Sequence, residues 1–112
     1  MRHADLQQRL LDAVLNAPGH ASRELRRTAL ARAAQLSGGR GERAERLPAS
    51  LAPYVDKVAR HAYQVTDADI IALRRAGSSE DAVFEITVAA ALGAALGRLE
   101  RGLAALGTQG QS

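Results

Sequence analysis

The stretch SSEDAVFEITVAAALGAALGRLERGLAAL, residues 78–106, decides the fold because it predicts one long α-helix. Ser78 or Ser79 is placed to cap its first turn, and Glu80 and Asp81 suit the positive end of the helix dipole. We expect the helix to reach about Leu106. An apolar stripe follows it at helical spacing, made of Val88, Leu92, Ala95, Leu96, Leu99, Leu103 and Leu106.

A second face of the same stretch carries a ridge of small residues at every fourth position, Ala89, Gly93 and Gly97. Each glycine costs about 1 kcal/mol relative to alanine inside a helix, so we expect another helix to approach this ridge closely. The alternative is that the ridge is the wall of an apolar ligand pocket. A small chain can hardly cover both faces, which predicts a homo-oligomer. Its interface would include Ala89, Gly93 and Gly97 or the stripe Leu96, Leu99 and Leu103.

Four shorter helices are predicted ahead of this one, so the chain is expected to be a single all-α domain of five helices. Scattered β-branched residues argue against a sheet. The N-terminal pair covers residues 1–36, a glycine-rich flexible linker 37–46, the remaining helices 47–107, and a disordered tail 108–112. The predicted helices are 5–16, ended by Pro18 and Gly19; 23–36, capped by Ser22; one from Pro48 or Ser50 to Gln64, with Pro53 in its first turn; and one capped by Thr66, running to Arg75 before Gly77.

The composition excludes several classes of chemistry. The 112 residues contain no cysteine, so disulfides, cysteine-ligated metals and thiol-based mechanisms are ruled out. No cofactor motif is found, and His3, His20 and His61 lack the spacing of a metal site.

Charge and hydropathy limit the expected partners. The net charge is only +3, and Glu24 interrupts the densest arginine group, which favours a solvated helix face over nucleic-acid binding. The uncharged stretch 86–97 is shorter than the roughly twenty residues of a membrane span. With no secretory signal at the N-terminus, we expect a cytoplasmic protein without a membrane partner.

Residues 54–107 show an ordered set of features: Val65-Thr66-Asp67-Ala68-Asp69, a short helix to Arg75, Ala76-Gly77, Ser79-Glu80-Asp81, and a long alanine-rich helix that carries Arg98. In this order they resemble the C-terminal half of the alkylhydroperoxidase D-like and carboxymuconolactone decarboxylase-like superfamily. The resemblance implies an all-α fold that assembles into trimers or hexamers. Peroxidase members use a C-x-x-C pair, which this chain lacks, so the resemblance does not extend to peroxidase activity.

The function predicted from these observations is a non-redox oligomeric binding or accessory module without a cofactor, which could work beside a catalytic paralogue or hold a small molecule. The alternative is a small cofactor-free decarboxylase or isomerase acting on a carboxylate-bearing substrate. Its candidate catalytic residues are His61, Glu85 and Arg98, because an imidazole beside an arginine that holds a carboxylate can support such chemistry. The competing interpretation makes His61 a surface histidine, Arg98 the partner of an acid, and Glu85 a solvated side chain.

Overall fold

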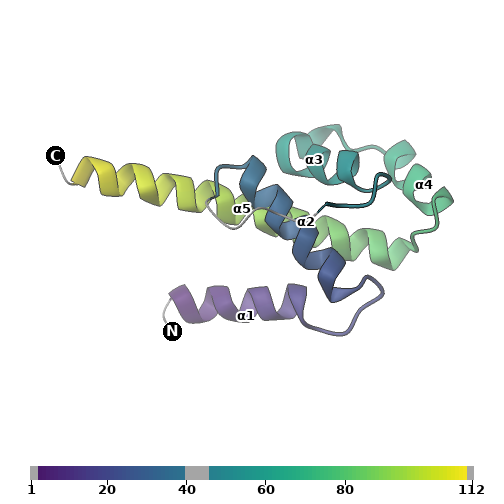
Figure 1. Ribbon diagram of the computed structural model, residues 1–112, viewed down its shortest axis with the longest axis horizontal. Coiled ribbons are helices and arrows are strands. Elements are labelled where there is room, and N and C mark those ends of the chain that lie inside the picture. Colours follow the sequence, from purple (N-terminus) through teal and green to yellow (C-terminus); the bar gives the residue numbers. More distant parts are fainter. Residues whose placement is uncertain (1–2, 40–45, 111–112) are drawn as a thin grey trace.

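The computed structural model describes residues 3–39 and 46–110, with side chains described for 5–39 and 46–107, and every regular element in these ranges is helical. The chain is therefore all-α with a long C-terminal helix, as the sequence predicts. Figure 1 shows how the helices are arranged. They are α1 (His3–Leu15), α2 (Arg23–Leu36), α3 (Ala52–His61), the short 3-10 helix η1 (Ala62–Gln64), α4 (Asp67–Arg75) and α5 (Glu80–Gly110).

Two of the predicted helix bounds need correction. The helix predicted to reach Gln64 ends at His61 and tightens into η1. The helix predicted to end near Leu106 continues to Gly110, so the disordered tail predicted from Thr108 is wrong for 108–110. Residues 40–45 of the predicted linker and 111–112 of the predicted tail lie outside the described residues.

Local capping interactions explain where the helices begin and end. The Ser22 hydroxyl accepts the Leu25 N–H at 3.1 Å, and the Ser79 hydroxyl accepts the Ala82 N–H at 3.1 Å. These bonds satisfy donors that the first helical turn leaves free. Gly77 has φ 109°, the left-handed conformation predicted for the residue that ends α4.

The small-residue ridge of α5 packs directly on the backbone of α2. A Cβ atom added to Gly93 would lie 2.8 Å from the carbonyl carbon of Leu30, and one added to Gly97 would lie 3.1 Å from that of Ala34. Ala89 is fully buried. The predicted close approach of another helix is confirmed, and the helix is α2 of the same chain, which fills the space that the pocket alternative required.

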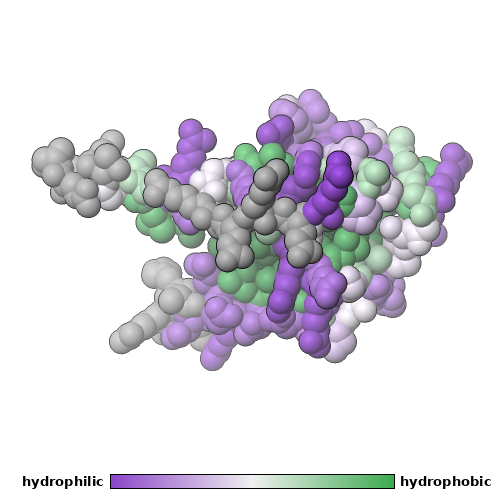
Figure 2. All heavy atoms as spheres, in the orientation of Figure 1, coloured by the Kyte–Doolittle hydropathy of each residue, from purple (hydrophilic) through white to green (hydrophobic). Residues whose placement is uncertain are grey.

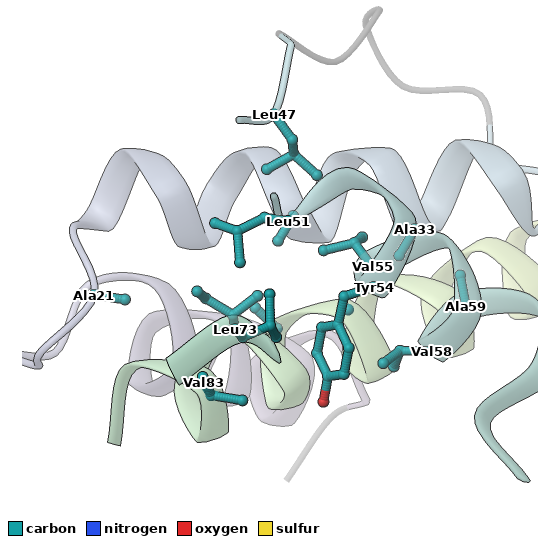
Figure 3. Packing of buried hydrophobic residues seen from close by; sticks show 14 of the residues in the cluster. Ala21, Ala33, Leu47, Leu51, Tyr54, Val55, Val58, Ala59, Leu73 and Val83 are labelled. Carbon is teal, nitrogen blue, oxygen red and sulfur yellow. The ribbon is translucent and has the colours of Figure 1, made fainter. Parts of the chain in front are cut away.

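The core lies where α3 covers the crossing of α2 and α5. Ile86 and Val55 are its largest fully buried side chains. The Tyr54 ring lies in this cluster, and its hydroxyl is 2.6 Å from Thr87 Oγ1, so the buried polar atom has a partner. Figure 3 shows the side chains of α3 packed with those of α2, α4 and α5.

Two helices project from this core towards the same end of the molecule (Figure 1). One is α1, which contacts α2 and α5 and packs Val14 on the core while Leu6 and Leu10 stay exposed. The other is the distal part of α5, from about Leu99 onwards. Their projection gives the molecule its elongated extents of 53 × 28 × 24 Å.

The hydropathy of α5 bears on the expected absence of a membrane span. Among the described residues, one segment, Glu80–Gly107, is long and apolar enough to cross a membrane by length and composition, with a mean hydropathy of 1.6. The sequence expectation rested on the uncharged stretch 86–97 alone, whereas this longer segment includes a few charged residues. Inside the structure, 39% of this apolar window is buried.

Candidate functional site

Glu85 joins two distant parts of the chain. Its carboxylate accepts the backbone N–H of His20 at 2.8 Å and that of Ala21 at 3.3 Å, 65 and 64 residues earlier. Nearby, His20 Nε2 lies 3.4 Å from Asp81 Oδ2. Glu85, expected to be a solvated side chain, is half-buried, and its carboxylate accepts backbone N–H groups ahead of α2. This is a structural role that holds the α1–α2 connection against α5.

The three candidate catalytic residues do not form one site. Glu85 and Arg98 are separated by thirteen positions on one helix, about 20 Å at about 1.5 Å per residue. His61 is exposed and contacts Tyr63 edge to face, with the ring centroids 6.0 Å apart. Arg98 donates from Nη2 to the Ala59 carbonyl oxygen at 2.8 Å, so its observed partner is a helix C-terminus rather than the expected acid.

A cleft of about 540 Å³ lies between the ends of α2 and α3 and the distal part of α5. Arg98 is part of it, together with two arginines that sequence reasoning did not single out, Arg60 and Arg101. The remaining lining residues are small or apolar apart from one serine: Leu36, Ser37, Ala59, Gly102 and Ala105. Arg60 is separated from the other two arginines by about forty residues, which is why the sequence alone gave no sign of the cluster.

An ion pair joins α2 to α3. Arg32 holds Asp56 through Nε at 2.5 Å and through Nη2 at 2.8 Å, and both side chains are about one-third exposed. The hydrogen bond from Arg32, and secondarily the positive charges of Arg32 and Arg60, hold the pKa of Asp56 below its ordinary value. Asp56 is thus already neutralised by Arg32, which leaves Arg60 available to the cleft.

This ion pair predicts an acid-sensitive contribution to stability. Because the folded pKa of Asp56 lies below its ordinary value of 3.8, the pair stabilises the fold above about pH 4 and stops doing so as the pH falls through the folded value. We expect Asp56→Asn to lower the melting temperature at pH 7. At pH 3 the melting temperatures of the variant and of the unmodified protein should be closer to each other. Arg32→Gln should show the same convergence, since it removes the same pair. Thermal unfolding followed by circular dichroism checks this, and an Asp56→Asn deficit that is equal at both pH values would contradict it.

Five of the exposed large apolar side chains lie on the two projecting helices. We call this set the assembly surface, and it comprises Leu6 (58% exposed) and Leu10 (49%) on α1 with Leu99 (50%), Leu103 (58%) and Leu106 (65%) on α5. Figure 2 shows apolar surface on the distal part of α5 and between this part and α1. Of the two interfaces predicted from the sequence, the ridge at Ala89, Gly93 and Gly97 is covered by α2, and Leu96 is partly buried. Leu99 and Leu103 are free to meet a partner.

Comparison of the chain with family models, with curated proteins and with solved structures gives no match. The described side chains contain no group of three or more His, Cys, Asp and Glu placed to hold a metal ion. The assembly surface and the arginine-lined cleft are therefore the two features of the molecule that point to a function.

Proposed function

We propose that the protein is a non-redox helical module that works as a homodimer, with each assembly surface covered by that of a second copy. The observation that carries this proposal is the exposure of five leucines on two helices that project in the same direction. Isolated exposed leucines are ordinary, but five of them gathered on two helices that project in the same direction support an interaction surface. Covering one half-exposed leucine contributes roughly 1 kcal/mol.

A second copy of the chain suits this surface because the spacing of its leucines allows two identical surfaces to pack against each other. Leu92, Leu96, Leu99, Leu103 and Leu106 follow one another at intervals of four and three residues, the spacing of a coiled-coil seam. A two-fold axis would place the distal α5 of each copy against α1 and α5 of the other, forming a four-helix bundle. One symmetric contact then buries every exposed leucine of the surface.

If α5 entered a membrane, the exposed leucines of the assembly surface would face lipid instead of a second copy of the chain. The middle of α5 carries the ridge on which α2 packs backbone to backbone, and insertion would have to strip α2 from it. This packing supports a core helix in a cytoplasmic protein, which is the location we propose.

Two negative charges on the distal α5 test the proposed dimer. At micromolar concentration we expect a mass near 24 kDa by light scattering, twice the 11.8 kDa of the chain. The double variant Leu99→Asp and Leu103→Asp should give about 12 kDa with unchanged helicity, because each buried charge would lack a partner. Ile71→Asp on α4 is the matched control, since this residue is 48% exposed but lies outside the assembly surface.

Three results would contradict the proposed dimer: a 12 kDa mass for the unmodified protein, an unchanged mass for the double variant, or flotation of the protein with lipid vesicles. A mass near 35 kDa would replace the two-fold pairing by a three-fold one. That result would favour the relation to the carboxymuconolactone decarboxylase-like superfamily, which we propose for residues 54–107 from the order of the caps and the long final helix.

The alternative function, a small decarboxylase or isomerase acting on a carboxylate-bearing substrate, has one observation in its favour. Arg98 lies in a cleft with two further arginines. His61 and Glu85, however, are not among the residues that line this cleft, so the arrangement supplies an anion-binding group without the proposed acid or base. The geometry supports binding better than catalysis.

A further inference from the structure

We propose that the cleft between α2, α3 and the distal α5 binds a phosphate monoester that carries a small apolar body. The inference goes beyond the assembly proposed above and rests on different residues. Three arginines, Arg60, Arg98 and Arg101, line one cleft, and its described lining contains no acidic residue. Guanidinium groups offer paired N–H donors in the planar geometry that phosphate and carboxylate oxygens accept.

The charge balance of the cleft favours a dianion. The three arginines bring three positive charges, and the C-terminal ends of α2 and α3 each contribute about half a negative charge. Arg98 donates one hydrogen bond to the Ala59 carbonyl oxygen, and this bond fixes the Arg98 side chain at the end of α3. Glu100, between the arginines in sequence, lies against Gly39 and not among the lining residues. About two positive charges therefore remain, and a phosphate monoester carries nearly two negative ones near pH 7.

Within the part of the chain that the structure describes, the arginines of the cleft form no ion pairs. Across residues 5–39 and 46–107, no acidic side chain pairs with Arg60, Arg98 or Arg101. Asp56, the carboxyl whose pKa the charge of Arg60 helps to lower, is bound through two nitrogens of Arg32. An incoming phosphate thus meets guanidinium groups without having to displace an acid.

The rest of the lining explains why the ligand should have an apolar body. Leu36, Ala59 and Ala105 offer no hydrogen-bonding side chains, and Gly102 leaves open space, since a Cβ added there would meet nothing within 4 Å. The cleft volume of about 540 Å³ falls in the range of small-molecule sites, about 300–1,000 Å³. A phosphate ion alone would leave the apolar lining residues exposed to water, whereas an apolar ring or short chain attached to the phosphate would cover them.

The cleft and the assembly surface occupy different faces of α5. At about 100° per residue, the directions of Arg98, Arg101 and Ala105 differ from those of the α5 leucines by roughly 130° on average, and Gly102 lies between the two faces. Ligand binding and assembly can therefore be measured independently on the same variants.

Phenyl phosphate is the probe, titrated calorimetrically into the full chain at about 20 mM NaCl, with benzyl alcohol and inorganic phosphate as comparisons. We expect a dissociation constant of the order of 1 mM or below for phenyl phosphate, and binding at least about fivefold weaker for each comparison molecule. Equal binding of phenyl phosphate and inorganic phosphate would overturn the apolar part of the proposal. Equal binding of phenyl phosphate and benzyl alcohol would overturn the anionic part.

Substitutions within and outside the cleft locate the site. Arg60→Gln and Arg101→Gln should each weaken phenyl phosphate binding by about fivefold or more, whereas Arg74→Gln, an equal charge change on α4, should weaken it less than about twofold. Gly102→Leu should block the cleft, and Gly107→Leu, also in open space but outside the lining, should leave binding unchanged. Light scattering should give these variants the mass of the unmodified protein.

The proposal fails if Arg74→Gln weakens binding as much as Arg60→Gln, because the attraction would then be a diffuse effect of net charge. It also fails if Gly102→Leu leaves the dissociation constant unchanged while circular dichroism shows the normal fold, because the phosphate would then sit outside the cleft. A loss of binding in Gly102→Leu but not in Gly107→Leu supports it.

Discussion

Alanine in place of Gly93 is expected to destabilise the fold by about 3 kcal/mol or more, which is at the upper end of overpacking effects. The added methyl group would meet the backbone of Leu30, with its carbonyl carbon 2.8 Å away, and backbone cannot rotate aside as a side chain can. The two helices would have to separate along their whole contact. Urea unfolding followed by circular dichroism at 222 nm measures the loss.

Gly102→Ala is the matched control for Gly93→Ala. Both substitutions exchange the same residues within α5, but a Cβ at Gly102 meets nothing within 4 Å. The control should therefore gain up to about 1 kcal/mol from the better helix propensity of alanine. Similar unfolding midpoints for the two variants would show that α2 does not approach the ridge as closely as described.

Methionine in place of Arg26 should produce the second large effect, a loss of about 2–4 kcal/mol. Arg26 is only 4% exposed and donates to the carbonyl oxygens of Val14 at 2.9 Å and Ala17 at 2.7 Å. Methionine keeps an apolar stem of similar length but removes the donors, so these carbonyl groups at the end of α1 lose their partner. Urea unfolding gives the overall loss.

Arg27→Met is the control for Arg26→Met, because Arg27 is exposed and donates to the Asn16 side chain at 3.0 Å. An exposed bond of this kind contributes at most about 1 kcal/mol, so the control should unfold close to the unmodified protein. Equal losses in the two variants would mean that burial of Arg26 does not matter. Amide hydrogen exchange adds a local measurement, since Arg26→Met should expose the α1 amides more than those of α2.

The sequence predicted the helices well because their boundaries depend on nearby residues. Ser22 and the glycines after Ser37 define α2, and Gly77 ends α4, through contacts within a few positions. The ridge at Gly93 and Gly97 also predicted a closely packed neighbouring helix from the sequence alone, since glycines inside a helix are unfavourable without one.

The site was harder to predict because its contacts join distant positions. The role of Glu85 depends on backbone N–H groups more than sixty residues earlier, and a backbone donor leaves no pattern in the sequence. The cleft arginines likewise meet only because α3 ends beside the distal α5. Arg98 was selected from the sequence for its charge, but its partner, a carbonyl group at a helix end, could be found only from the fold.

The backbone-to-backbone contact of α2 with α5 has a mechanical consequence. Where helices meet through long side chains, rotamer changes let them slide, but at Gly93 and Gly97 no side chain lies between the two helices to adjust. The pair should behave as one stiff rod, so that bending or shear is confined to parts held by single side chains. Foremost among these is α1, which is held by Val14, by Arg26 and, through the α1–α2 connection, by Glu85, so we expect it to move more readily than the α2–α5 pair.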